Sequence, residues 1–142
     1  MFDDETVEFL NRPLLMRLAT LGADGYPQVT PVWYLQEGGR LYTSTQRDRV
    51  KYRNMSRDRR VGASIDDDVQ PYRGVSIKGV ATFHEPGEPG FDARNMVRRI
   101  VARYTSPAEV DDMVDWLFQG PRVVIEIEPV NVAKIGSGWA QP

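Results

Sequence analysis

Hydrophobic and polar residues repeat along the chain with two different periods. Most of the sequence alternates with a period of two, which predicts strands that bury one face of a sheet. A short N-terminal segment and three later segments contain no such alternation or have helical spacing, and they predict helices. Turns rich in glycine, such as GADG and EGG, separate neighbouring strands and are typical of hairpins. The predicted strands cover residues 14–21, 26–36, 40–46, 60–66, 72–85 and 121–135, and the predicted helices cover 3–11, 48–57, 91–104 and 106–119.

The order of these elements predicts the fold class. Residues 14–46 hold three strands joined by short turns, which predicts an antiparallel meander. Gly79 interrupts a long strand and is a candidate bulge. Asp3 or Asp4 is the predicted cap of the first helix, and Ser106 is the predicted cap of the last. We therefore expect one domain, residues 1–142, with a mainly β (α+β) fold: a six-stranded antiparallel barrel with peripheral helices.

The composition narrows the chemistry. Hydrophobic residues make up 41% of the 142 residues, enough for a core, but no apolar run is long enough to cross a bilayer. The acidic N-terminus does not have the pattern of a signal peptide, so we expect a cytoplasmic protein without a membrane partner. The chain has no cysteine for a thiolate nucleophile or a sulfur-bound metal. His84 is predicted to face solvent at a strand end. Asp66–Asp68 could bind a hard cation, but we interpret it as an acidic loop and predict no metal site.

Positive charge is concentrated in the segment RDRVKYRNMSRDRR, residues 47–60. It holds seven of the 18 basic residues, although the whole chain has a net charge of −2. Such a segment can bind a nucleic acid or a phosphate, or it can simply be a solvated helix face. The acidic overall charge and the lack of a helix-turn-helix partner argue against a nucleic acid.

A phosphate fits the same segment better. Arg49 and Lys51 fall in the first turn of the predicted helix 48–57, where free N–H groups and the helix dipole favour an anion. The hydroxyls of Thr43–Thr45 end the preceding strand. These features predict a phosphate cradle. The outer residues Arg47, Arg57 and Arg59 are interpreted as a solvated surface.

Three motifs in this part of the chain resemble a known family. They are G-x-P-Q-V-T-P-V-W over residues 25–33, a strand ending in T-S-T, and R-x-K-x-R-N-M-x-R-D over residues 49–58. Together they resemble the pyridoxamine 5′-phosphate oxidase-like proteins with a split β-barrel, in the versions typical of the branch that uses coenzyme F-420. The resemblance covers residues 7–83 and, loosely, the final strand. One departure is Asp58-Arg59-Arg60 where the family usually has Asp-Pro-Arg, which changes the turn after the helix.

The resemblance implies a homodimer with two cofactor sites at the interface between the subunits. Arg49 and Lys51 would hold the cofactor phosphate with Asn54 alongside, and Ser44 and Thr45 would contact the phosphate or the ribityl chain. Other residues would surround the ring system or close the site, with Ile77 and Lys78 coming from the second subunit. The full set of implied cofactor-binding residues is Gln28, Thr30, Pro31, Val32, Trp33, Ser44, Thr45, Arg49, Lys51, Asn54, Ile77, Lys78 and Trp139.

The implied function is that of a reductase in which F-420 transfers a hydride to a small organic substrate. The cofactor carries the reactivity, so no catalytic side chain is needed, and Tyr34 is only a candidate proton donor. Two alternatives stay open: an FMN-dependent oxidoreductase, and a non-catalytic flavin or deazaflavin carrier. Arg53 and Arg60 are assigned either to salt bridges or to the polyglutamate tail that F-420 carries and FMN lacks. Trp116 is interpreted as helix packing.

Overall fold

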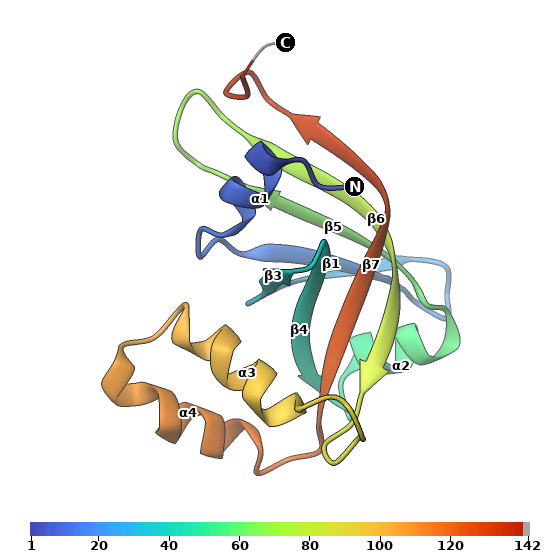
Figure 1. Cartoon of the computed structure of the whole chain (residues 1–142). Coiled ribbons are helices and arrows are strands. Elements are labelled where there is room, and N and C mark those ends of the chain that lie inside the picture. Colours follow the sequence, from blue (N-terminus) through green and yellow to red (C-terminus); the bar gives the residue numbers. More distant parts are fainter. Residues whose placement is uncertain (141–142) are drawn as a thin grey trace.

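The main feature of the protein is one antiparallel sheet that curls into a half-barrel (Figure 1). The computed structural model describes residues 1–140, and within them the sheet has seven strands in the order β2-β1-β5-β6-β7-β4-β3. This arrangement confirms the predicted mainly β barrel with peripheral helices. The strands are β1 (Met16–Leu21), β2 (Pro27–Val32), β3 (Leu35–Glu37), β4 (Arg40–Gln46), β5 (Arg60–Asp66), β6 (Gly74–His84) and β7 (Arg122–Ile135).

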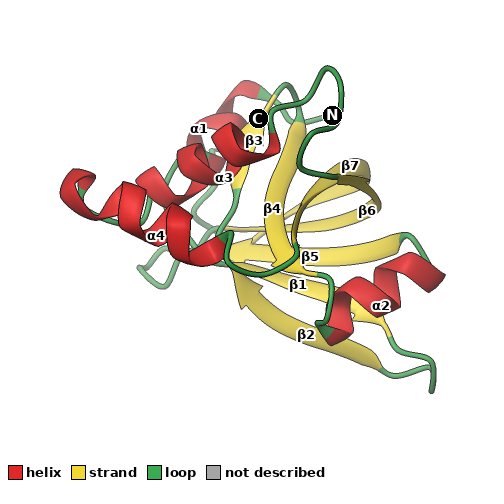
Figure 2. Ribbon diagram, turned by 90° about the horizontal axis from the view of Figure 1, so that it is seen from below, coloured by secondary structure: helices red, strands yellow, loops and turns green. Residues whose placement is uncertain are grey.

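The helices lie around the sheet, with the pair α3–α4 and helix α2 on opposite sides of β4 (Figure 2). The Asp3 carboxylate caps the first helix by accepting a hydrogen bond of 2.8 Å from the Thr6 N–H. Ser106 makes no such bond with its side chain, and the chain enters α4 through a 3₁₀ turn. None of the helices in residues 1–140 is long and apolar enough to cross a membrane. The helices are α1 (Asp4–Leu10), α2 (Val50–Arg57), α3 (Ala93–Ala102), the 3₁₀ turn η1 (Pro107–Glu109) and α4 (Val110–Leu117).

The predicted meander over residues 14–46 is wrong, because the predicted second strand is divided in two. Strand β2 pairs only with β1, whereas β3 pairs with β4 at the other edge of the sheet. The strict alternation stops where Tyr34 and Leu35, although consecutive, are both buried, each in a different core cluster. This break carries the chain from one edge of the sheet to the other and raises the strand count from the predicted six to seven.

The break also produces the split of the barrel. Between β2 and β4 there is no ladder of backbone hydrogen bonds in the described residues. The Thr43 hydroxyl instead donates to the Trp33 carbonyl at 2.6 Å, and the Tyr34 N–H donates to the Tyr104 hydroxyl at 3.3 Å. The Thr43 side chain thus links β4 to the segment after β2, Tyr104 holds this segment to the end of α3, and the outer edge of β2 stays open.

Two hydrophobic clusters support this arrangement. One fills the barrel and includes Met16, Ile65 and Ile125, and the other packs α3 and α4 against β4 and β7 through residues such as Ile100 and Val124. The predicted bulge at Gly79 is confirmed, because the register between β6 and β7 shifts at this residue. A Cβ atom here would lie 2.6 Å from Ile127 Cγ2, so only glycine lets the two strands approach so closely.

Candidate functional site

Helix α2 begins beside the end of β4 with a cluster of positive charge. Arg49 is the N-cap residue and Lys51 lies in the first turn, as predicted. No side chain caps the helix, and the first turn holds no acidic residue. The partial positive charge of the helix start is therefore left for an anion from outside the chain.

A third cation, Arg122, joins this cluster from the first position of β7. Strand β7 pairs with β4 in a register that places Arg122 opposite Gln46, close to the start of α2. The Arg122 Nη1 donates to the Ser44 hydroxyl at 3.2 Å. Sequence reasoning missed this residue. The available signal was a basic residue opening the final strand, but the pairing of that strand with β4 could not be read from the sequence.

The three cations repel one another. Burial lowers the pKa of the Lys51 ammonium, and the charges of Arg49 and Arg122 lower it further. Burial and the charge of Arg49 likewise lower the pKa of Arg122. Among residues 1–140 no carboxylate forms an ion pair with any of the three. Lys51 and Arg122 are half-buried and Arg49 is exposed beside them. Like charges placed in this way are unfavourable unless an anion offsets them, so the cluster is a candidate anion site.

A cleft of about 300 Å³ leads away from this cluster. Ser44 and Arg122 lie at its polar end, and Val32 and Trp33 contribute to its wall from the end of β2. Thr43 of β4 also lines it, and helices α3 and α4 provide the rest of the lining with apolar side chains. The cleft therefore connects an anion site with an apolar space beside the split of the barrel.

Strand β2 offers polar groups without partners. Its last residue, Val32, lines the cleft, whereas Gln28 lines a separate hollow of about 530 Å³ between β2 and α2. Gln28, Thr30 and Val32 share one face of the strand, and the side-chain oxygens of Gln28 and Thr30 are buried without a hydrogen bond. Val29 and Pro31 lie on the opposite, exposed face. An unpaired buried polar atom is costly, and the open edge of β2 adds unpaired backbone groups. These groups fit a planar ligand with polar edges.

A family comparison explains this combination. The sequence model of the family described as pyridoxamine 5′-phosphate oxidase matches residues 2–136 of the chain. The chain belongs to the pyridoxamine 5′-phosphate oxidase family. No curated protein matches it significantly.

Solved structures of this fold agree with the family assignment. The conserved hypothetical protein Rv2991 of Mycobacterium tuberculosis is 31% identical, with a TM-score of 0.76 over 96% of this chain and 85% of its own. An F-420 reductase is 27% identical, with a TM-score of 0.62 over 89% of this chain and 94% of its own. The heme storage protein HutZ of Vibrio cholerae is 16% identical, with a TM-score of 0.75 over 96% and 95%, and so shares the fold alone.

Two residues implied by the family resemblance do not face the anion site. The Asn54 amide is buried, donates to the Thr20 hydroxyl at 3.1 Å and accepts from Arg57 at 3.1 Å, so it joins α2 to β1. Thr45 is buried on the face of β4 opposite to Ser44. Of the two predicted hydroxyls, the structure therefore brings only Ser44 to Arg122.

The residues expected to close the site are also placed differently. Trp139 is only 6% exposed, stands edge-on against Phe9, and donates from its indole nitrogen to the carbonyls of Gly74 and Ile135. An indole held in the core in this way is not available to cover a cofactor. The Ile77 side chain is likewise part of the core, whereas Lys78 is exposed on β6.

Tyr34 is not placed to donate a proton to a substrate. Its hydroxyl is buried in the barrel core and donates to the Leu10 carbonyl at 2.8 Å, with the Arg12 carbonyl at 3.1 Å. Burial, together with the nearby Tyr104, raises the pKa of the Tyr34 hydroxyl far above its ordinary value. The candidate role of Tyr34 is therefore corrected to a structural one, the joining of α1 to the barrel.

The other basic residues of the 47–60 segment are mostly engaged within the chain. Arg47 forms an ion pair with Glu85, and Arg60 forms one with Asp58 at 2.7 Å. Arg59 lies over the Phe83 ring, 4.3 Å from its centroid. Arg53 is exposed and donates only to the Asp48 carbonyl among the contacts in residues 1–140. Arg53 and Arg60 were expected either to form salt bridges or to bind the polyglutamate tail. Arg60 forms a salt bridge, whereas no carboxylate in residues 1–140 pairs with Arg53.

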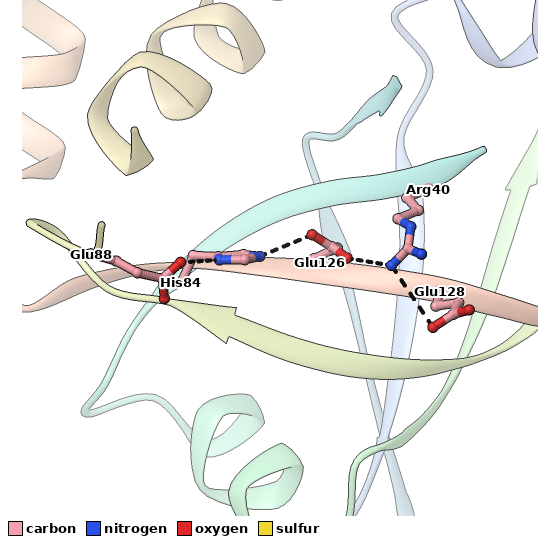
Figure 3. A network of polar contacts seen from close by, with 5 residues as sticks. All are labelled: Arg40, His84, Glu88, Glu126 and Glu128. Carbon is pink, nitrogen blue, oxygen red and sulfur yellow. Dashed lines mark hydrogen bonds and ion pairs between the residues drawn. The ribbon is translucent and has the colours of Figure 1, made fainter. Parts of the chain in front are cut away.

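The prediction that His84 faces solvent is wrong, because its ring is held in a chain of charges (Figure 3). The side chain is 16% exposed, with Nδ1 at 2.6 Å from a Glu88 oxygen and Nε2 at 2.9 Å from a Glu126 oxygen. Glu126 also accepts from Arg40 at 2.6 Å. A neutral imidazole carries one N–H and cannot donate to both carboxylates, so this geometry requires the imidazolium. His84 thereby ties the loop before α3 to β7.

This network predicts a stability that falls as the pH rises. Burial alone would lower the pKa of His84, but the hydrogen bonds to Glu88 and Glu126 outweigh it and raise the pKa above 6.5. The folded state then binds more protons than the unfolded state, so the contribution is complete below 6.5 and is lost as the pH passes the raised value. Between about pH 6 and pH 9 the free energy of unfolding in urea should fall further in the wild type than in His84→Gln. Equal falls in both proteins would contradict the assignment.

Proposed function

We propose that this protein binds the deazaflavin coenzyme F-420 and transfers a hydride from it to a small organic substrate. The observation that carries the proposal is the cluster of Arg49, Lys51 and Arg122 at the start of α2, which has no counter-ion in residues 1–140. A phosphate bound there would relieve the repulsion among the three cations and accept their hydrogen bonds. The Ser44 hydroxyl, already bonded to Arg122, adds one more polar contact.

The ring system of such a cofactor fits the neighbouring strand. The unpaired oxygens of Gln28 and Thr30 and the open edge of β2 offer partners to the polar edges of a flavin-like ring. Val32, on the same face of the strand, supplies apolar surface. Phosphate and ring would thus be held by neighbouring elements, α2 and β2, on either side of the split.

Three observations support F-420 over FMN. The motifs resemble the F-420 branch, and an F-420 reductase is 27% identical over 89% of the chain. Arg53 is exposed on the helix that carries the proposed phosphate cradle, and within residues 1–140 its only partner is a carbonyl, so it can pair with an acidic tail. F-420 carries such a tail and FMN does not.

The chain's own residues then bind, orient and shield rather than react. When bound, the reduced deazaflavin supplies the hydride. The cations fix the phosphate, β2 fixes the plane of the ring, and α3 and α4 cover one side of the cleft and exclude water. With the Tyr34 hydroxyl buried in the core, the proton that completes the reduction comes from solvent.

We also propose that the functional unit is a homodimer with its cofactor sites at the interface, as family members are typically dimeric. The outer face of β1, β5 and β6 supports this, because it carries an apolar hollow of about 580 Å³. Val80 and Val130 are exposed in its lining, and Lys78 lies beside them. A second subunit seated there would bury this surface and bring its own Lys78 toward the interface.

A titration with each cofactor tests the proposal. Adding F-420 to the purified protein should quench the intrinsic tryptophan fluorescence, because Trp33 lies beside the proposed ring site. We expect F-420 to bind at least about tenfold more tightly than FMN, since the acidic tail adds at least one charge-assisted contact. Tight binding of FMN with no response to F-420 would contradict the proposal and favour an FMN-dependent oxidoreductase. Tight binding of F-420 without turnover of any acceptor would favour the carrier.

A further inference from the structure

Trp116 is a large apolar side chain that helix α4 leaves 63% exposed. The prediction that it serves helix packing is wrong, because Val110 and Val114 are the buried residues of α4 and pack against α3. Trp116 instead lines the cleft together with Met113, which lies three residues earlier on the same side of the helix, and with Leu117. An exposed indole that continues the apolar surface of a cleft is typical of a binding surface.

The wall at the end of β2 is already aromatic and rigid. The Trp33 indole is stacked on the Tyr104 ring, with the centroids 5.0 Å apart and the planes within 2° of parallel. The Tyr104 hydroxyl is anchored in turn on the Leu14 carbonyl at 2.6 Å. Trp33 therefore has one ring face occupied and its plane held, whereas the exposed Trp116 is free to adjust at the rim.

The two ends of the cleft differ in chemistry. Ser44 and Arg122 form the polar end, which belongs to the proposed phosphate site. The part between α4 and the end of β2 is lined by Val32, Trp33 and Met113, with no charged side chain. The whole cleft has a volume of about 300 Å³, which lies at the lower end of the range for ligand sites. A space of this size suits a molecule of one or two rings.

We infer that this apolar part of the cleft binds the hydride acceptor, that the acceptor is an uncharged flat ring compound, and that Trp116 determines this specificity by stacking on it. The inference rests on the proposed function, because the neighbouring cofactor is what makes the occupant an acceptor. Trp116 is a specificity residue and not a catalytic one. Its indole contributes apolar area and a ring face at low entropic cost, and both favour planar over flexible ligands.

Binding measurements with two uncharged aldehydes test this inference. Naphthaldehyde is flat and has two fused rings, whereas hexanal carries the same reactive group on a flexible chain. Calorimetric titration of the full-length protein, with and without F-420, should show that Trp116→Ala weakens naphthaldehyde binding by about tenfold. Trp116→Phe should recover most of the loss, and hexanal affinity should change by less than about twofold. Tyr72→Ala, which removes another exposed aromatic ring outside the cleft, should change neither.

The outcomes separate this inference from the proposed function. F-420 affinity should be the same in the wild type and in Trp116→Ala, and saturating naphthaldehyde should not displace F-420. Displacement would place the cofactor ring in the cleft and overturn the inference while leaving cofactor binding intact. An unchanged naphthaldehyde affinity in Trp116→Ala, with or without a weakened dimer in sedimentation, would also overturn it. Failure of the wild type to bind F-420 would instead overturn the proposed function. The aldehyde titrations without F-420 would still show whether the cleft binds a flat ring through Trp116.

Discussion

Replacing Arg49 and Lys51 together by alanine should weaken F-420 binding at least about a hundredfold. Hydrogen bonds to charged groups each contribute about 1.5–3 kcal/mol, and two such contacts to one phosphate would be lost. Arg122 remains as the single cation of the cluster, and two of its nitrogens already donate to Ser44 and to the Leu117 carbonyl, so it compensates for only part of the loss. Equilibrium dialysis of the wild type and the double variant against F-420 gives the ratio directly.

The same double variant should fold at least as stably as the wild type when no cofactor is present. Burial is the main cause of the lowered pKa values of Lys51 and Arg122, and the neighbouring positive charges lower them further, so the cations disfavour each other in the free protein. Removing two of the three relieves this repulsion, so the Tm of the cofactor-free variant should be unchanged or higher. A merely structural role for these residues would instead lower it.

A matched control removes two positive charges elsewhere. Arg94 and Arg98 lie on the exposed side of α3 and pair with Asp115 and Asp111. Replacing both by alanine changes the net charge equally but leaves the start of α2 intact. If this control lost F-420 affinity as strongly as the double variant does, a general effect of charge would explain the result and the phosphate cradle would be wrong.

Replacing Trp139 by alanine should destabilise the fold by about 3–5 kcal/mol, the usual cost of removing a large buried aromatic side chain. The indole packs on Phe9, and its nitrogen donates to two carbonyls that would lose this partner. Urea denaturation of the variant and the wild type measures the difference. The folded fraction of the variant should keep its affinity for F-420, because Trp139 lies in the core and not beside the proposed site.

This prediction separates the observed position of Trp139 from the one implied by the family resemblance. A tryptophan that closed a cofactor site would lose affinity on truncation and leave the stability nearly unchanged. Trp116→Ala is a suitable control, because the same truncation at an exposed position should cost little stability. A small loss of stability in Trp139→Ala with a large loss of F-420 affinity would contradict the assignment made from the structure.

Local patterns predicted the individual elements well, because they depend on residues that are close in sequence. The period of two in residues 60–66 and the cap at Asp3 are of this kind, and both are confirmed. The pairing of strands is not local. The meander over residues 14–46 failed because burial of Tyr34 and Leu35 on consecutive positions depends on two separate cores, and no short pattern shows which core a residue will join.

His84 shows the same limit for a polar residue. Its position at a strand end suggested solvent, yet Glu126 of β7 and Glu88 of the following loop enclose it. Glu88 is near in sequence and could have been considered as a partner. Glu126 comes from a strand far along the chain, and only the pairing of β6 with β7 brings it to the ring.

The sequence by itself determined the positions of two of the three cations in the proposed phosphate cradle. Arg49 is the N-cap of α2 and Lys51 lies in its first turn, so a local motif was enough to place them at a helix start. Only the tertiary structure added Arg122, through the register of β7 on β4, and opened the cleft that Trp116 borders. The physical reason is that a helix arranges neighbours in sequence, whereas a curled sheet brings together residues that are far apart along the chain, and no local pattern shows which of them will meet.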